Sequence, residues 1–354
     1  MSAVTTQTTG SRVTSALGSF VKARETGILL ALVLIVVVTT AKNPNFLFSN
    51  DGFRDLLLTP SILLLVAVGQ AIVIITRNVD LSVGSTLGLT AYLTGRLFID
   101  VPGIPIIAGL VFGGFLGLIN GALVAFARVP ALVITLGTLY AYRGLDVLWI
   151  GSSRIDPSDL PDGFTDLGSA SVLGIPILTI VAVLVVLVAA YSLAYRPSGR
   201  EFYAIGSDDA AARLYGLPVG RRVFTAFVIS GGLAGLAGVM YTARYATVSS
   251  NSGTGLELQA VAAAVIGGVA IFGGSGTVVG ALLGAVLLTT INRMLPTIGV
   301  QDFWQQAVVG VLIILAIVLD RLLTLRASRR LTDSSGPETI TPPEPASTEQ
   351  KVSR

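Results

Sequence analysis

The sequence predicts an all-α, polytopic integral membrane protein with about ten transmembrane helices, two related halves and helices broken at glycines. Three observations lead to this fold class. Of the 354 residues, 53% are hydrophobic and only 12% are charged, which is about half the charged fraction of a soluble domain. Several apolar stretches approach the roughly 20 residues that a helix needs to cross a bilayer. The chain also contains 40 glycines, which allow the backbones of membrane helices to approach closely.

The apolar stretches follow one another along most of the chain and define the candidate spans. A further helix is expected over residues 131–150. Two regions, 76–90 and 266–282, interrupt apolar runs with serine, threonine and glycine, and the sequence leaves their topology open. Counting about 20 residues for each crossing gives about ten spans. The uninterrupted stretches are residues 27–41, 56–76, 104–126, 172–194, 223–241 and 303–319.

The two ends of the chain differ in composition from the membrane domain, which we place at residues 26–322. Residues 1–25 are rich in serine and threonine and are expected to form a cytoplasmic leader. They do not resemble a cleaved signal peptide, because no small-residue cleavage site follows the first apolar run. Residues 323–354 are rich in proline, glutamate, serine and threonine, which predicts a disordered cytoplasmic tail.

The distribution of arginine sets the expected orientation of the spans. Segment 196–222 carries five arginines, whereas segment 151–171 carries one. Because positively charged loops stay on the cytoplasmic side, the first segment is expected inside and the second outside. With an even number of spans, both termini are cytoplasmic.

Two interrupted regions resemble each other and suggest an internal repeat. The sequence AIVIITRNVDLSVGSTLG (71–88) aligns with AAVIGGVAIFGGSGTVVG (263–280), so that Gly84 and Gly88 meet Gly276 and Gly280. Paired glycine-interrupted segments in two halves indicate a transport pathway at the repeat interface. The alternative is that both segments are ordinary small-residue packing helices.

Arg77 and Asp80 argue against that alternative in the first region. A charge at the centre of a bilayer costs about 2.5–3.5 kcal/mol even on lenient scales. At i,i+3 spacing the two side chains could pair, or they could lie at a water-filled break near the membrane surface. Asp80 or Ser82 could also cap the helix that follows. Arg143 and Asp146 repeat the i,i+3 spacing and are expected to pair or to lie at the outer membrane surface.

Composition excludes several classes of function. The chain has no cysteine and no histidine, so thiolate chemistry, histidine acid–base catalysis and the usual zinc sites are unavailable. No lysine follows a glycine loop, so the chain has no phosphate-binding P-loop. We therefore expect no enzyme activity, no metal and no cofactor, and any ATP must be hydrolysed by another chain. The net charge of +3 lies in membrane-flanking loops and does not indicate nucleic-acid binding.

The expected cytoplasmic loop 196–222 contains a short helix over residues 208–215. Acidic residues stand at its start, and a glycine and a proline follow its end, which is typical start and stop chemistry. A helix of two turns is not stable alone in water, so it needs a surface to dock on, either a partner or its own protein. The candidate docking residues are Gly199, Gly206, Asp208, Asp209, Ala211, Ala212, Arg213 and Gly216.

Four separated stretches resemble one family, the membrane permease subunits of ribose-type monosaccharide ABC importers. Within that family the permeases for rhamnose and for autoinducer-2 are the most similar. The resemblance covers about residues 27–321, in the order of the family's own motifs. The stretches are RNVDLSVGS (77–85), TLGTLYAYRGLDVLW (135–149), GREFYAIGSDDAAARLYGLPVGR (199–221) and GTGLELQAVAAAVIGGVAIFGGSGTVVGALLGA (253–285).

The resemblance implies a permease that moves a monosaccharide or related small sugar, of rhamnose, ribose or autoinducer-2 type, across the bacterial cytoplasmic (inner) membrane. It also implies a second permease subunit, identical or related, a cytoplasmic ATP-binding subunit docked on loop 196–222, and an extracytoplasmic sugar-binding protein. The sugar itself stays open, because specificity resides largely in the binding protein.

An ion-coupled secondary transporter of a small polar solute is the alternative, because such proteins also use broken helices in paired halves. In that case Asp80, Asp146 or Glu257 would carry the coupling proton. In either case the candidate pathway residues are Gln70, Arg77, Asn78, Asp80, Ser82, Asn120, Tyr140, Arg143, Gly274 and Ser275.

Overall fold

The computed structural model describes residues 24–100, 104–151 and 153–301, together with scattered helical positions between 304 and 318. The predicted leader, except for its last two residues, and the predicted disordered tail lie outside the described residues. In the described part of the chain the all-α fold is confirmed, with one hairpin of two short strands added.

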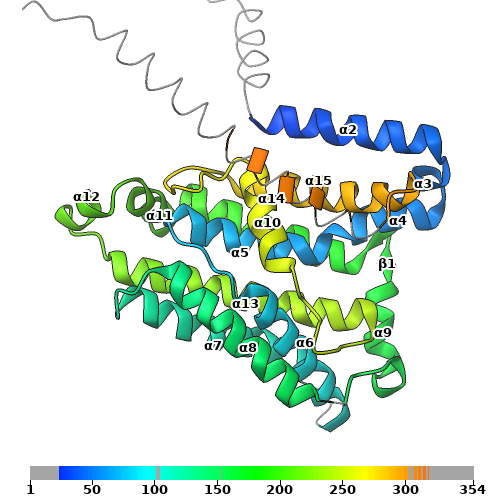
Figure 1. The fold of residues 1–354 in the computed structure, drawn as a ribbon, viewed down its shortest axis with the longest axis horizontal. Helices are drawn as coiled ribbons and strands as arrows, with labels where there is room; N and C mark the ends of the chain where they lie inside the picture. The colour runs from blue at the N-terminus through cyan, green and yellow to red at the C-terminus, as the bar shows by residue number, and fades with distance from the viewer. Residues whose placement is uncertain are drawn as a thin grey trace, which may run out of the picture.

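Figure 1 shows the helices in their spatial arrangement. The strands β1 (Ser171–Val172) and β2 (Ile175–Pro176) pair antiparallel, with Val172 opposite Ile175. The helices in chain order are α2 (Arg24–Lys42), α3 (Asn45–Phe48), α4 (Asn50–Leu58), α5 (Pro60–Ile75), α6 (Val83–Asp100), α7 (Pro105–Ala125), α8 (Ala131–Ile150), the 3-10 turn η1 (Pro157–Asp159), α9 (Asp162–Ser169), α10 (Ile177–Tyr195), α11 (Pro197–Ser207), α12 (Asp209–Leu214), α13 (Val219–Tyr245), α14 (Leu256–Ile266) and α15 (Val278–Thr297).

Seven helical segments in the described residues are long and apolar enough to cross a membrane. They include each predicted apolar stretch up to residue 241 and the predicted helix 131–150. The predicted stretch 303–319 is described only at scattered positions, all of them helical. The seven segments are Glu25–Lys42, Asn50–Ile75, Pro105–Ala125, Ala131–Ile150, Ile177–Tyr195, Val219–Tyr245 and Val278–Thr297.

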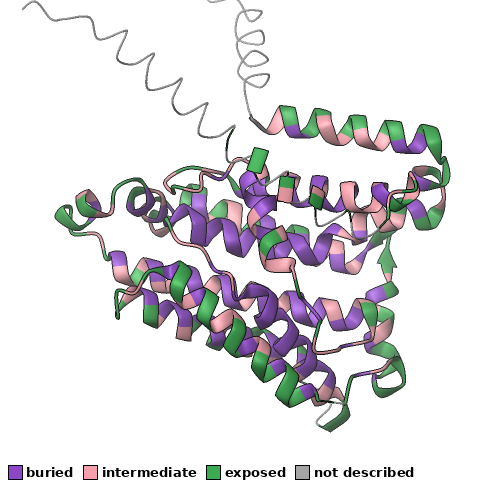
Figure 2. Cartoon of the chain, in the orientation of Figure 1, coloured by how far each residue is buried: buried purple, intermediate pink, exposed green. Residues whose placement is uncertain are grey.

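Helix α5 forms the centre of the core, and all of its residues are buried. Its sequence PSILLLVAVGQAIVII is apolar on every side, as expected for a helix that is surrounded by others. Helices α10, α13, α14 and α15 pack around it. In Figure 2 the buried colour fills α5 and much of α13, whereas α2 and α8 expose many residues. On α10 only Leu178, Ala182, Val186 and Leu193 are buried. The exposed residues on these outer helices include large apolar side chains such as Leu34, Leu148 and Val188, as expected for surfaces that face lipid.

Glycines allow α7 and α13 to pack backbone against backbone. The glycines of α7 recur every fourth residue and face Phe227, Gly231 and Gly235 of α13. A side chain at Gly113 or Gly117 would collide with the α13 backbone. This is the close approach that small residues permit between membrane helices, and it accounts for part of the chain's high glycine content.

Both predicted interruptions are present as gaps between consecutive helices, but only the second is a break at glycines, because Gly84 and Gly88 lie within α6. Residues 76–82 separate α5 from α6, and residues 267–277 separate α14 from α15. The two helix–break–helix units touch, because α5 packs against both α14 and α15. The second break contains Gly268, Gly273, Gly274 and Gly276 at positive φ, a conformation that glycine adopts without steric cost.

Candidate substrate pathway and coupling surface

A buried polar network organises the first break around Asp80, which is 1% exposed. Its Oδ1 accepts hydrogen bonds from the Ser82 backbone N–H at 3.0 Å and from Ser82 Oγ at 2.7 Å. Asn120 of α7 donates to Ser82 Oγ at 2.7 Å, and Ser230 of α13 donates to Asp80 Oδ2 at 3.3 Å. With its amide turned to satisfy both groups, Gln70 of α5 bonds the Asp80 backbone N–H and C=O. The network therefore joins three helices to the break.

Four predicted pathway residues, Gln70, Asp80, Ser82 and Asn120, are thus brought together, but Arg77 is not among them. Arg77 is exposed and has φ 67°, and the ion pair with Asp80 that the spacing allows is not formed. The neighbouring Asn78 donates to the Thr76 carbonyl at 2.8 Å. Arg77 therefore lies at the rim of the break, whereas Asp80 lies inside the protein.

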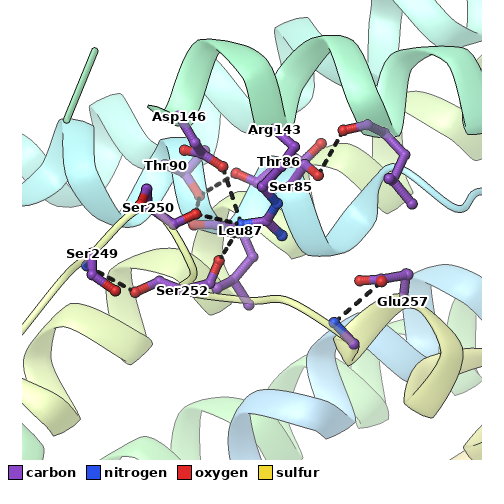
Figure 3. A network of polar contacts seen from close by, with 12 residues as sticks. Ser85, Thr86, Leu87, Thr90, Arg143, Asp146, Ser249, Ser250, Ser252 and Glu257 are labelled. Carbon is purple, nitrogen blue, oxygen red and sulfur yellow. Dashed lines mark hydrogen bonds and ion pairs between the residues drawn. The ribbon is translucent and has the colours of Figure 1, made fainter. Parts of the chain in front are cut away.

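A second polar cluster lies where α8 meets the loop between α13 and α14 (Figure 3). Arg143 and Asp146 pair at 3.4 Å, as their spacing predicts. The same Arg143 nitrogen donates to the Ser250 carbonyl at 3.0 Å and to the Ser252 carbonyl at 2.8 Å. The guanidinium thereby fixes this loop against α8. We call these groups, together with Glu257 of α14, the Arg143 cluster.

The Arg143 cluster leaves acceptor oxygens without donors. Asp146 is fully buried, yet its Oδ1 has no hydrogen-bond partner among the described residues, and neither has Glu257 Oε2. The α6 glycines Gly84 and Gly88 make room for these groups, since a side chain at either position would collide with the Glu257 or the Asp146 carboxylate. Vacant buried acceptors are costly in a folded protein and can receive the hydroxyl hydrogens of a polar solute.

A cavity of about 430 Å³ lies on the other side of the same loop. Its lining combines two tyrosines with amides, hydroxyls and one arginine, which is chemistry suited to sugar-like solutes. The rings of Tyr241 and Tyr245 lie 4.6 Å apart, and Asn292 Oδ1 is buried without a partner among the described residues. The polar and aromatic lining residues are Thr59, Tyr241, Tyr245, Asn251, Thr254, Gln259, Thr289, Asn292 and Arg293.

The sequence interpretation missed this cavity, because its lining residues are far apart in the sequence. They come from the α4–α5 junction, α5, α13, the loop after α13, α14 and α15. It also placed Tyr140 in the pathway, whereas the Tyr140 side chain is 69% exposed on the outer side of α8. Tyr142 turns inward instead, and its hydroxyl donates to the Leu116 carbonyl at 3.2 Å. Helical register decides this difference, because two positions along a helix differ by about half a turn.

The loop 196–222 touches both breaks directly. Gly206 at the end of α11 lies against the Ile75 carbonyl and the Gly274 N–H, which themselves form a 3.0 Å hydrogen bond. Tyr203 of α11 donates to the Gly276 carbonyl at 3.1 Å. Burial raises the pKa of Tyr203, so its hydroxyl keeps the proton that it donates. The predicted pathway residues Gly274 and Ser275 therefore lie at the junction between loop 196–222 and the second break.

The short predicted helix of the loop is confirmed as α12. Asp208 caps its first turn by accepting from the Ala211 N–H at 2.9 Å, and Arg213 pairs with Asp209 at 3.2 Å. Ala212 is buried against the protein itself, whereas Leu214 is 89% and Tyr215 is 86% exposed. The exposed surface of α12 therefore ends in two large side chains that the sequence interpretation did not single out.

Comparison with known proteins identifies the family. A family model described as "Branched-chain amino acid transport system / permease component" matches residues 53–317. The chain belongs to this family. It is similar to three curated proteins, each named autoinducer 2 import system permease protein LsrC. The one from Salmonella typhimurium (strain LT2) is 37% identical over 331 residues, covering 93% of this chain and 94% of the relative.

The other two relatives show similar identity and coverage. The protein of Enterobacter sp. (strain 638) is 37% identical over 335 residues, 92% of this chain and 97% of the relative. The protein of Escherichia coli (strain K12 / DH10B) is 35% identical over 333 residues, 93% of this chain and 96% of the relative. No solved structure matches the chain.

These findings confirm the resemblance drawn from the four sequence stretches. The chain is the permease component of an ABC importer, a multi-pass membrane protein and a transport subunit rather than an enzyme. Importers of this kind work with an ATPase and a binding protein. Family membership decides against the ion-coupled secondary transporter.

Proposed function

We propose that this permease carries a small polyhydroxylated solute, of the autoinducer-2 or monosaccharide type, across the bacterial cytoplasmic membrane. The observation that carries the proposal is the 430 Å³ cavity with its tyrosines, amides and arginine. Ile62, Leu63 and Leu256 also line the cavity and can contact the apolar face of such a solute. The curated relatives are named for autoinducer-2 import, which favours this solute class over a branched-chain amino acid.

The proposed topology has ten spans and both termini in the cytoplasm. Helix α6 is not among the seven apolar segments because the charged Arg96 and Asp100 make it less hydrophobic. Helix α14 is not among them because it has only 11 residues. These two and the stretch 303–319 bring the seven apolar segments to ten. The helix–break–helix units α5–α6 and α14–α15 then represent the two related halves, within a transport domain spanning residues 26–322.

The proposed pathway begins at the cavity and passes the Arg143 cluster. In the proposed topology the cavity lies toward the outside, on the side of the binding protein. Solute hydroxyls donate to Asp146 Oδ1 and Glu257 Oε2, and the Arg143 contacts hold the intervening loop in place. The exit lies between the two breaks, near Asn78 and Ser275, with Arg77 at its rim. Weak binding at each point suits a pore, because affinity resides in the binding protein.

Loop 196–222 is the proposed docking surface for the ATPase subunit. Tyrosine is a frequent anchor of protein interfaces, and Tyr215 at the tip of α12 is exposed next to the exposed Leu214. Movement of α12 passes through α11 to Gly206, which touches both breaks. A second permease subunit, identical or related, completes the pore, with its contact on the exposed apolar helix faces.

Transport in proteoliposomes tests the proposal. The permease is reconstituted with its cognate ATPase and binding protein, and uptake of labelled autoinducer-2, rhamnose, ribose and leucine is compared. We expect ATP-dependent uptake of one of the three polyhydroxylated solutes and no uptake of leucine. Uptake of leucine instead, with none of the three others carried, would contradict the proposed substrate class.

A further inference from the structure

Two helices end on an arginine where a glycine is usual. Arg77 follows α5 with φ 67°, and Arg128 follows α7 with φ 58°. A helix commonly ends with one left-handed residue, and that residue is most often glycine, because a side chain there costs free energy. Ala246 makes the same exception after α13, with φ 51°, so the turn alone does not distinguish the two arginines. What distinguishes them is the pocket that they share.

Both arginines line one pocket of about 350 Å³ at the end of the molecule that carries α12. The charged residues of the pocket are three arginines and one aspartate. Arg213 pairs with Asp209 at 3.2 Å, whereas Arg77 and Arg128 are exposed and have no carboxylate partner within the part of the chain that the structure describes. Two cationic groups therefore remain available to an anion.

The walls of the pocket are largely apolar and come from four helices, one of which is α11 with Ile205. The other three contribute Val124 and Ala125 of α7, Ala131 of α8, and Val219 and Val223 of α13.

Apolar side chains continue this surface outside the pocket. Phe126 is 61%, Leu132 is 56% and Val133 is 61% exposed, and all three are close in sequence to Arg128. A cationic pocket whose walls lead onto exposed apolar helix ends fits a molecule with an anionic head and an apolar tail.

We propose that Arg77 and Arg128 bind the phosphate of an anionic phospholipid in the inner leaflet. Basic pockets between membrane helices on the cytoplasmic side bind such headgroups. The inference rests on the proposed topology, which places this end of the molecule in the cytoplasm. A carboxylate of the ATPase subunit is the competing occupant, but it would not account for the exposed apolar side chains beside the pocket.

The test uses the purified full-length permease alone, so that it does not depend on transport. Thermal unfolding is followed in detergent micelles containing either phosphatidylglycerol or phosphatidylcholine. We expect phosphatidylglycerol to raise the melting temperature more. The double variant Arg77→Asn/Arg128→Asn should lose this difference, because asparagine tolerates the left-handed turn but carries no charge. Loss of two surface arginines should weaken phosphatidylglycerol binding on the order of 30-fold.

The matched control is Arg221→Gln, which removes an exposed arginine at the start of α13, outside the pocket. It should keep the full phosphatidylglycerol effect. Equal protection by both lipids in the wild type, or an undiminished effect in the double variant, would overturn the proposal. So would equal protection by inorganic phosphate in phosphatidylcholine micelles. In a separate binding assay with the ATPase subunit, weakened binding of the double variant in both lipids alike, with the phosphatidylglycerol effect intact, would assign the pocket to the protein partner instead.

Discussion

Among the residues that the structure describes, two aspartates, Asp80 and Asp146, are buried, and their surroundings are of opposite kinds. Both Asp80 oxygens have donors, which come from the break itself and from α13. Asp146 has Arg143 on one oxygen and no partner on the other within the described residues. In the Asp80 network the vacant acceptor is the neutral amide oxygen Asn120 Oδ1, whereas in the Arg143 cluster the vacant acceptors belong to two carboxylates. A carboxylate with donors on both oxygens fixes one arrangement of the chain, whereas a carboxylate with a vacant oxygen leaves a place for a solute. We therefore interpret Asp80 as a structural joint and the Arg143 cluster as part of the pathway.

The largest effect is expected at the structural joint. Asp80→Ala removes the acceptor of the Ser82 and Ser230 donors and leaves these groups buried and unpaired, which should cost about 3 kcal/mol or more. We expect little folded protein after detergent extraction, measured by size-exclusion chromatography. Asp80→Asn is the matched control, because its remaining oxygen still accepts from Ser82. Normal yield of the alanine variant would show that the network does not hold the fold.

The next effect concerns the Arg143 cluster and should separate transport from stability. Arg143→Met removes the donor to two loop carbonyls and to Asp146. Hydrogen bonds from a charged donor are worth about 1.5–3 kcal/mol each, so we expect uptake to fall roughly 10- to 100-fold while folded protein is still recovered. The control Arg96→Met removes an arginine whose ion pair with Asp100 is exposed. If both variants transport equally, the cluster has no role in the pathway.

A third variant tests whether movement passes from loop 196–222 to the joint. A methyl group at Gly206 would collide with the Ile75 carbonyl and the Gly274 N–H. We expect Gly206→Ala to lower ATP-driven uptake about tenfold, comparable to a cost of about 1.4 kcal/mol, while the ATPase subunit still binds. Gly163→Ala is the control, since no atom lies near its added methyl group. Loss of ATPase binding by the Gly206 variant would indicate a docking defect instead.

The smallest effect is expected from Ser230→Ala at the edge of the joint. The variant loses one 3.3 Å hydrogen bond, and Asp80 keeps both Ser82 donors. A single hydrogen bond contributes about 1 kcal/mol, so the melting temperature should drop by a few degrees and uptake should stay near normal. A strong fall in uptake at unchanged melting temperature would mean that the joint itself moves or binds solute.

Much of the fold follows from local sequence, because each feature is contained in a short segment. Apolar runs locate the spans, and the acids and the glycine around residues 208–216 locate α12. The Arg143–Asp146 pair follows from i,i+3 spacing alone. In each case the interacting groups lie within a few turns of one helix, so periodicity and capping chemistry are sufficient to predict them.

The rest depends on contacts between distant segments. Ser230 lies 150 residues from Asp80, and the Arg143 donor meets carbonyls more than 100 residues away. Backbone carbonyls carry no sequence signal, so the second contact could not be predicted. The cavity residues Asn292 and Arg293 look like ordinary helix positions until α15 is placed beside α5 and α14.

Cysteine accessibility tests the central contrast most directly, because the native chain contains no cysteine. Single cysteines are placed at Ser252 in the Arg143 cluster and at Ser230 in the joint, which are 5% and 1% exposed. A hydrophilic thiol reagent is then added to the complete importer with and without ATP and loaded binding protein. We predict that turnover accelerates labelling at Ser252→Cys and leaves Ser230→Cys unreactive. Labelling of Ser230→Cys during turnover, with none at Ser252→Cys, would contradict the account.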